Sequence, residues 1–474
     1  MVKSTEFTPS RRMRWVYRLS MTWLGSLILL HLLALHGMFG DVFMDMANGR
    51  WILAHHTVPL SNQLNPTAEG RFWSQPEWLY GVYVAWLWHI GGAWGIWWGL
   101  VPWVAAMVYG VVLVTEPAGV LWGTLLTLAV VVSLHSFMSP RPQLLSYAWF
   151  IGGLWALQQW RKHRDWPVWV FASMTLIWTQ CHPSVFLDPL LLIAEALWGP
   201  RRPRRDLLWP ILLAGVGCFI RPAGLAGASH HLGALFAPVI RQSIQEWTPW
   251  HPWSTLGWIF MPWMAVVPVL IVRAVRRSDA IAVVWAVAGA LALILAIRFA
   301  PYFVLGVAAL GGEALAPLPI ERHAGLLGFW ILITGLGVSA LSLTGMFATT
   351  GSFPVREPLA AFAVLRREKA QEVLAAYAWG DALDFYGPPP FADARAGFWS
   401  QEPWWNAYVR TQRGLENPAQ FAAQWAPHCD AMLWPWGSPA ARAMRKNSQW
   451  RLIAHIVKNG QSVGIWYRGL DVPS

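Results

Sequence analysis

Long apolar stretches separated by short polar connections occupy most of the chain. An α-helix needs about 20 mostly apolar residues to cross a lipid bilayer. The pattern predicts about eleven membrane-spanning helices, some of them short enough to be tilted or re-entrant. They are expected at 15–39, 79–90 joined to 93–114, 119–138, 143–160, 167–181, 184–198, 206–220, 256–273, 279–297, 301–317 and 325–346.

The pattern changes in two long polar loops, 40–78 and 221–255, and again after residue 347. The remaining tail is mixed in charge and does not span. It has helical spacing over 359–377 and alternating apolar positions over 450–456 and 462–467. We therefore expect a transmembrane domain over 1–347 and a small α/β domain over 348–474.

Basic residues indicate which connections face the cytoplasm. The N-terminus is basic, and basic clusters lie at 161–164, 201–205 and 273–277, in alternate connections. By the positive-inside rule, these connections and the N-terminus are cytoplasmic. No small-residue cleavage site follows the basic N-terminus, so the first span is expected to be retained. The two polar loops and the tail are then periplasmic, in a multi-pass protein of a bacterial inner membrane.

Composition supports a membrane protein. Of the 474 residues, 56% are hydrophobic and only 12% are charged, against about 25% charged in soluble chains. The 36 Trp residues fit the preference of Trp for the headgroup boundary. The net charge of +11 arises largely from the loop clusters, and no nucleic-acid motif accompanies it. Cys181, Cys218 and Cys429 form no CxxC pair, which argues against a thiolate metal site and leaves one disulfide open.

Several ionisable residues lie at the expected outer ends of the spans. Arginine binds phosphate through a planar fork, and a carboxylate can act as a general base or hold a divalent cation. Each residue also has a simpler structural explanation, such as a helix cap or an arginine that reaches the headgroups. The candidates are Asp41, Asp45 and Glu77 for catalysis, Arg141, Arg221 and Arg298 for phosphate, and Trp78, His182 and Glu246 for substrate contacts.

The first outer loop resembles that of a large group of bacterial membrane proteins. It reads D-V-F-M-D-M-A-N-G-R-W-I-L from Asp41, where the group reads roughly D-x-W-W-H-L-x-x-G-x-W-I-L. It continues V-P-L-S-N-Q-L-N-P-T-A-E-G-R-F-W-S-Q-P-E-W-L, where the group reads I-P-x-x-D-P-F-S-Y-T-x-x-G-x-x-W-x-x-H-E-W-L. Short matches follow in the same order: R-P-Q at 141–143, C-H-P-S at 181–184, R-P-A-G-L at 221–225, Q-E-W at 245–247, R-F-A-P-Y-F at 298–303, W-G-D at 379–381 and F-A-D-A-R at 391–395.

The group looks like the C-class (GT-C) membrane glycosyltransferases, which use polyprenyl-phosphate sugars. The resemblance implies a GT-C-like fold and a lipid-linked sugar donor as partner, alongside membrane lipids and without nucleic acid. It gives Asp41 the acidic position of the first outer loop, as general base or as partner of a divalent cation, Mg²⁺ or Mn²⁺. Arg141 and Arg298 match the group's arginines and are the best candidates for the donor phosphate.

The chain departs from the group at several polar positions. Asp45 and Pro76 replace histidines, and Asn62 begins N-Q-L-N where the group has D-P-F-S. Arg221 begins R-P-A-G in place of N-P-Y-G, and His182 is followed by proline rather than glycine. In the tail, W-G-D and F-A-D-A-R replace the usual W-G-G and F-I-D-G-R. These changes indicate either an altered substrate or a loss of catalysis.

The sequence thus favours a glycosyltransferase that moves a sugar from a polyprenyl-phosphate donor to an acceptor on the periplasmic face. A non-catalytic scaffold or assembly subunit on the same fold is the alternative that the altered positions favour. A transporter is a second alternative, but it should show inverted repeats and helices broken at the midplane. The sequence shows neither feature.

Overall fold

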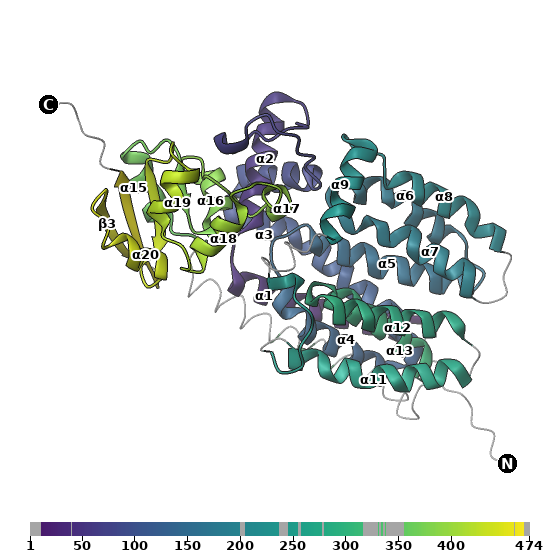
Figure 1. The fold of residues 1–474 in the computed structure, drawn as a ribbon. Helices are drawn as coiled ribbons and strands as arrows, with labels where there is room; N and C mark the ends of the chain where they lie inside the picture. Colours follow the sequence, from purple (N-terminus) through teal and green to yellow (C-terminus); the bar gives the residue numbers. More distant parts are fainter. Residues whose placement is uncertain are drawn as a thin grey trace, which may run out of the picture. The chain divides into compact units, whose positions relative to one another are not determined.

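The computed structural model of this chain is mostly helical, with a small sheet near the C-terminus (Figure 1). It divides into two compact units, which are described separately below. The helical unit comprises Met1–Gly37, Ala93–Arg221 and Glu246–Pro354, and the mixed unit comprises Met38–Gly92, Pro222–Gln245 and Val355–Ser474. The structure describes residues 11–38, 40–199, 204–236, 245–254, 257–276, 279–315, four positions between 330 and 337, 355–458 and 460–468.

Four helical segments in the described ranges are long and apolar enough to cross a membrane: Arg11–His36, Trp78–Ala118, Val120–Phe137 and Gly257–Arg276. The shorter helix Ala280–Leu295 is also apolar. These segments give the chain the character of a multi-pass membrane protein. The number of about eleven spans stays a prediction, and its last member, 325–346, lies almost wholly outside the described residues.

The helical unit consists of helices joined by short connections. In Figure 1, α5 to α8 lie side by side, and α4 lies with α11, α12 and α13 in a second group. Its helices are α1 (Arg11–His36), the second part of α3 (Trp78–Thr115), α4 (Val120–Leu134), α5 (Gln143–Arg161), α6 (Trp166–Cys181), α7 (Leu187–Trp198), α8 (Leu208–Gly217), α11 (Gly257–Arg276), α12 (Ala280–Leu295) and α13 (Ala300–Ala314). Short 3₁₀ turns are η2 (Glu116–Ala118), η3 (His135–Phe137), η4 (Pro183–Phe186), η5 (Arg204–Leu207), η6 (Gln245–Trp247) and η7 (Ile297–Phe299).

Helix α3 is broken where the sequence predicts a join between two helices. Gly91 and Gly92 have non-helical backbone angles, and Gly92 has a φ of 56°. Glycine adopts this left-handed region without the steric cost that a Cβ would add. The boundary between the two units falls after Gly92. The prediction of 79–90 joined to 93–114 is therefore confirmed.

The mixed unit begins with α2 (Asp41–His55) and the first part of α3. The two helices approach closely at two glycines, because a Cβ on Gly49 would lie 2.1 Å from the carbonyl oxygen of Gly81. Helix α2 ends at His55, and His56 follows it in a left-handed conformation with a φ of 54°. Two more elements belong to this part: η1 (Pro66–Ala68) and α9 (Gly224–Phe236).

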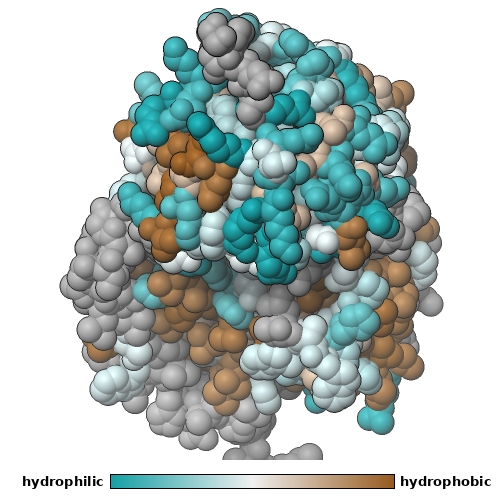
Figure 2. Space-filling model, turned by 60° about the vertical axis from the view of Figure 1, so that its left-hand side comes forward, coloured by the Kyte–Doolittle hydropathy of each residue, from teal (hydrophilic) through white to brown (hydrophobic). Residues whose placement is uncertain are grey.

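The C-terminal part of the mixed unit, Val355–Arg468, contains a four-stranded sheet in the order β1-β2-β4-β3. β1 and β2 are parallel, and β2–β4 and β3–β4 are antiparallel. We call this part the C-terminal segment; Figure 2 brings it forward and shows that hydrophilic side chains predominate on that face. Its elements are α15 (Leu359–Arg367), β1 (Val373–Ala375), η9 (Tyr377–Trp379), α16 (Gly380–Tyr386), α17 (Ala396–Trp399), α18 (Trp405–Gln412), α19 (Pro418–Trp425), β2 (Ala431–Pro435), α20 (Pro439–Met444), β3 (Trp450–Lys458) and β4 (Gln461–Arg468).

One secondary-structure prediction for this segment is wrong. The helical spacing over 359–377 continues only to Arg367, and Val373–Ala375 form β1 instead. Lys369 has a positive φ of 57°, which ends the helix. The three strand residues are fully buried and pair with β2, so tertiary contacts override the local helical pattern.

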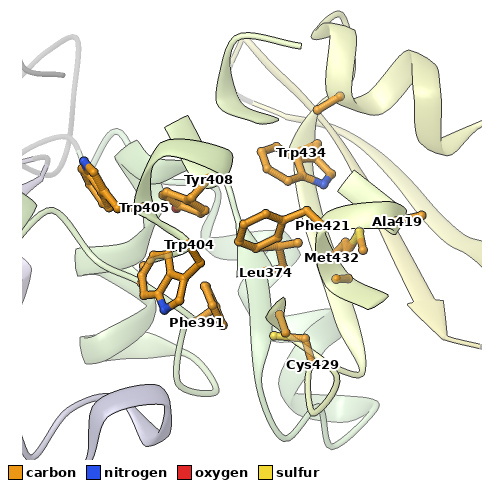
Figure 3. Close-up of a cluster of buried hydrophobic side chains, with 14 of the residues drawn as sticks. Leu374, Phe391, Trp404, Trp405, Tyr408, Ala419, Phe421, Cys429, Met432 and Trp434 are labelled. Atoms are coloured by element: carbon orange, nitrogen blue, oxygen red, sulfur yellow. The ribbon is translucent and has the colours of Figure 1, made fainter. Parts of the chain in front are cut away.

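An aromatic core holds the C-terminal segment together. Figure 3 shows Phe391, Trp404, Tyr408 and Phe421 gathered beside the strand residue Leu374. The ring centroids of Phe391 and Trp404 are 4.7 Å apart, and those of Phe391 and Phe421 are 5.6 Å apart. Aromatic side chains bury large areas and add geometric specificity. This core gives the loops of the segment a rigid base.

Candidate functional site

Each unit contains part of the predicted set of functional residues. In the helical unit, Arg141, Glu246 and Arg298 lie together, and we call them the arginine site. Arg141 Nη1 donates a hydrogen bond to Glu246 Oε1 at 2.6 Å. The guanidinium of Arg298 stacks 4.2 Å from the ring centroid of Trp247, the residue after Glu246. The structure therefore brings three of the predicted residues into one place.

Short turns at the ends of helices position these side chains. Arg141 lies between Pro140 and Pro142, whose rings restrict the backbone just before α5 begins. Arg298 lies in η7, and the backbone N–H of Ile297 donates to the carbonyl oxygen of Thr248 at 3.0 Å. That bond ties η7 to the stretch that carries Glu246, so the geometry rests on backbone contacts as well as on side chains.

The arginine site is electrostatically suited to anions. Burial alone would raise the pKa of Glu246, but the positive charges of Arg141 and Arg298 outweigh it and lower that pKa below its ordinary value. One ionised carboxylate thus faces two guanidinium groups, which leaves one positive charge. A phosphate group could occupy such a site through bidentate arginine contacts.

His182 lies in the same unit, between α6 and η4, and is buried. Its Nδ1 accepts a hydrogen bond from the backbone N–H of Ser184 at 3.2 Å and lies 2.7 Å from the hydroxyl of Ser184. Because Nδ1 accepts from a backbone amide, the proton of a neutral His182 is on Nε2. His182 thus caps η4, which is a structural role.

Arg221 is also buried in this unit, in the turn after α8. Its backbone N–H donates to the carbonyl oxygen of Phe219, and its charge acts on the thiol of Cys218. The contacts that join the arginine site do not involve it. All three cysteines are buried as free thiols, so the disulfide that the sequence left open is not formed.

A second set of charges lies at the far end of α5. Arg161 donates to both carboxylate oxygens of Glu195, at 2.8 and 2.7 Å, and to Glu313 at 2.8 Å. Arg141 and Arg161 flank a helix of 19 residues, which spans about 27 Å at 1.5 Å per residue. The alternation of helix directions that the basic clusters predict stays a prediction, and so does the side that faces the cytoplasm.

In the mixed unit, the two predicted carboxylates of the first outer loop lie on α2. Asp41 is the first residue of the helix and is half-buried. Asp45 is fully buried, and its Oδ1 accepts a hydrogen bond from Gln75 Nε2 at 3.2 Å. Glu77 and Trp78 lie at the start of α3, where the carbonyl oxygen of Glu77 accepts from the N–H of Gly81 at 2.8 Å.

Two further carboxyl groups lie near Asp41, and sequence reasoning did not select either. The N–H of Gly40 donates to Glu357 Oε1 at 3.2 Å, and burial raises the pKa of Glu357 to about 7. Asp381 lies in the first turn of α16, which packs against α2. Burial and the charges of Asp41 and Asp393 raise the pKa of Asp381 well above its ordinary value. Both causes disfavour the charged form of the Asp381 carboxyl group.

One sequence signal could have identified Asp381. It ends the W-G-D motif, where the group of bacterial proteins usually has W-G-G. The neighbouring Gly380 is required, because a Cβ there would lie 2.5 Å from the carbonyl oxygen of Ala392. An aspartate in place of the usual glycine buries an ionisable group, which costs free energy of folding. A functional role for Asp381 would explain why the chain carries this cost.

The described residues do not form a cation site. No three His, Cys, Asp or Glu side chains in those ranges are arranged to hold a metal ion. Asp45, a predicted partner of Asp41, already accepts a hydrogen bond from an amide. The residues present do not fit the expected divalent cation, and no step of the chemistry below involves one.

Comparison with known proteins gives a likeness of fold. No family model matches the chain, and no curated protein matches it. Archaeal oligosaccharyltransferase AglB from Archaeoglobus fulgidus, solved with an inhibitory peptide and a dolichol-phosphate, matches with a TM-score of 0.57 at 10% identity, over 96% of this chain and 75% of that one. The apo oligosaccharyltransferase of that organism matches with a TM-score of 0.52 at 11% identity, over 88% and 69%. Its complex with Zn and sulfate matches with a TM-score of 0.50 at 11% identity, over 88% and 68%.

Proposed function

We propose that this chain is a membrane glycosyltransferase of the GT-C kind. It would transfer a sugar from a polyprenyl-phosphate donor to an acceptor on the periplasmic face of a bacterial inner membrane. The fold likeness to oligosaccharyltransferases supports the class of reaction. The observation that carries the proposal is the arginine site, where two guanidinium groups flank a single carboxylate.

In the proposed reaction, Asp41 removes the proton from the acceptor hydroxyl. The resulting oxygen attacks the anomeric carbon of the donor sugar, and the bond from that carbon to the phosphate oxygen breaks. The phosphate leaves with an additional negative charge, which Arg141 and Arg298 stabilise. A single displacement of this kind inverts the anomeric carbon and needs one base.

The decisive experiment measures sugar transfer from a labelled polyprenyl-phosphate sugar by the full-length protein in nanodiscs. Asp41→Asn should lower kcat by about 10²–10⁴-fold, the usual contribution of a general base. Arg298→Met should lower it by about 10²–10³-fold through lost stabilisation of the leaving group. Arg445→Met is a matched control, because Arg445 also stacks on a tryptophan, Trp436, at 4.5 Å. Equal activity in a well-folded Asp41→Asn variant would contradict the role of Asp41.

A second function is favoured by one specific observation. Asp45, Asn62 and His182 all make internal hydrogen bonds that a purely structural role explains. A non-catalytic scaffold on the same fold would use them in this way. If the wild-type protein transfers no sugar and copurifies with a stoichiometric partner protein, the scaffold is the better account.

A further inference from the structure

One arginine of the C-terminal segment binds the first outer loop. Arg395 Nη2 donates to Asn62 Oδ1 at 2.8 Å and also contacts Asn65 Oδ1. Arg395 Nε and Nη2 donate to the carboxylate of Asp393 at 2.6–2.9 Å. The side chains of Arg395 and Asp393 are 1% and 0% exposed, so this pair is fully removed from solvent.

The amide groups of the loop complete this contact. Asn65 Nδ2 donates to Asp384 Oδ1 at 3.0 Å and to the carbonyl oxygen of Pro390 at 3.2 Å. Thr67 Oγ1 donates to Glu372 Oε1 at 2.6 Å. The loop is therefore held to the C-terminal segment by side chains more than 300 positions away in the sequence.

An aromatic cage surrounds the guanidinium of Arg395. Its Cζ atom lies 5.3 Å from the ring centroid of Trp73, 4.9 Å from Phe398 and 5.6 Å from Trp399. Trp73 also packs edge-on against Phe398, with centroids 5.3 Å apart. Stacking on a desolvated arginine fixes the plane of the Trp73 ring.

The fixed ring of Trp73 leads directly to Asp45. Trp73 Nε1 donates to Gln75 Oε1 at 2.9 Å, which orients the amide of Gln75. Gln75 Nε2 then donates to Asp45 Oδ1 at 3.2 Å. Without the indole donor, the Gln75 amide could rotate and present its oxygen to the Asp45 carboxyl.

We propose that Arg395 is a positioning residue for Asp45, acting through Trp73 and Gln75. The C-terminal segment then fixes the carboxyl group of Asp45, which lies one helical turn from the proposed base Asp41 on the same face of α2. The inference rests on the proposed function for its catalytic consequence. The positioning itself can be measured without any activity.

The first experiment labels carboxyl groups in the full-length protein with a carbodiimide and glycine ethyl ester, and quantifies Asp45 by mass spectrometry. Trp73→Phe keeps the stacked ring and removes only the indole donor. Labelling of Asp45 should rise about tenfold, because a hydrogen bond to a charged group shifts a local opening equilibrium by about this factor. Exposed Glu69 serves as internal reference.

Trp405→Phe is the matched control for that variant. Trp405 is also buried and belongs to the same aromatic core, and its indole N–H has no hydrogen-bond partner among the described residues. Its substitution should leave the labelling of Asp45 unchanged. Equal labelling in both variants, whether raised or not, would overturn the proposal, since a general loosening of the core would then explain the result.

The second experiment uses Arg395→Lys, which keeps the charge beside Asp393 and loses the planar fork that reaches Asn62 and Asn65. Labelling of Asp45 should rise as in Trp73→Phe, with Arg445→Lys as control. If the wild type transfers sugar, kcat should fall about tenfold to hundredfold and the donor KM should stay within about twofold. An unchanged kcat, or a change in KM alone, would overturn the proposal. If the wild type is inactive, the proposed function fails, and labelling still decides the positioning.

Discussion

Buried charged side chains are arranged differently in the two units. In the helical unit, arginines and carboxylates form direct ion pairs. Arg141 binds Glu246, and Arg161 binds both Glu195 and Glu313. These pairs lie at the two ends of the helices, where long side chains reach the polar headgroup region. At the arginine site, two arginines lie beside one carboxylate, and at the other end one arginine binds two carboxylates.

In the mixed unit, acidic groups outnumber the arginine that they surround. Asp393 is ionised, because the charge and hydrogen bonds of Arg395 outweigh burial and lower its pKa. Burial and the charge of Asp393 raise the pKa of Asp384 well above its ordinary value, as they do for Asp381. Like charges in a shared site cannot all ionise. Under the proposed function, the helical unit would bind the phosphate of the donor and the mixed unit would take up the proton of the acceptor.

Arg395→Met should have the largest effect on stability. It leaves the carboxylate of Asp393 buried without its cation, which costs about 3–5 kcal/mol of unfolding free energy. Equilibrium unfolding of the full-length protein, followed by proteolysis of the C-terminal segment, measures the change. Arg445→Met is the control and should cost less than about 1 kcal/mol. Comparable losses in the two variants would mean that the buried pair is not what stabilises this segment.

Glu357 tests the proton chemistry of the mixed unit. Its pKa is about 7 in the folded protein against an ordinary 4.5. The folded protein keeps this proton between these values and the unfolded chain loses it, so the free energy of unfolding falls as pH rises through that window. The fall reaches up to about 3 kcal/mol at 1.36 kcal/mol per pKa unit.

Glu357→Gln removes this titration while keeping an oxygen for the N–H of Gly40. The variant and the wild type should be equally stable at pH 4, and the variant should be more stable at pH 8. Thermal unfolding across this pH range measures the difference, with the exposed Glu368→Gln as control. Parallel curves for Glu357→Gln and the wild type would show that Glu357 is ionised in the folded protein.

Local patterns in the sequence predicted much of the helical unit. The apolar pattern predicted a join between 79–90 and 93–114, and α3 is broken there, at Gly91 and Gly92. Arg141 and Arg298 were selected because they lie at the expected outer ends of spans and match the arginines of the group that the chain resembles. These features depend on residues close in sequence, so their spacing carries the information.

The mixed unit was much harder to predict, because its contacts join distant positions. Helical spacing suggested a helix to residue 377, but pairing with β2 makes Val373–Ala375 a strand. Asn62 counted only as a departure from a motif, and its partner Arg395 lies 333 positions away. The spacing of apolar and polar residues along one segment cannot predict a contact over such a distance in the sequence. Only the unusual aspartate of W-G-D pointed toward Asp381.

Arg161→Met removes the guanidinium group that binds Glu195 and Glu313 in the helical unit. Glu195 is fully buried and Arg161 is 19% exposed, so the expected loss is about 2–3 kcal/mol, below that for a fully buried pair. Thermal unfolding in detergent measures it. Arg164→Met is the control, since Arg164 is exposed and its side chain donates a hydrogen bond to the uncharged Gln159. The comparison of the two units would fail if Arg161→Met destabilised the protein more than Arg395→Met.

Asn62→Asp should have the smallest effect and tests the altered loop motif directly. It restores the residue type that the group of bacterial proteins has at this position. The new carboxylate would accept a stronger, charge-assisted bond from Arg395. It would lose the Nδ2 donor that binds the carbonyl oxygens of Asn65 and Ala68 at 2.9 and 3.1 Å. It also adds a negative charge beside Asp393.

These opposing terms should nearly cancel, leaving a loss of about 1 kcal/mol or less in unfolding free energy at pH 7. The charge term vanishes when the carboxyl groups are protonated, so the loss should shrink as the pH is lowered. Unfolding of wild type and variant at pH 7 and pH 5 measures the loss itself and its decrease with pH. A gain in stability at pH 7 would show that the surplus of acidic groups around Arg395 is smaller than the contacts indicate. The difference in charge between the mixed unit and the helical unit would then be smaller as well.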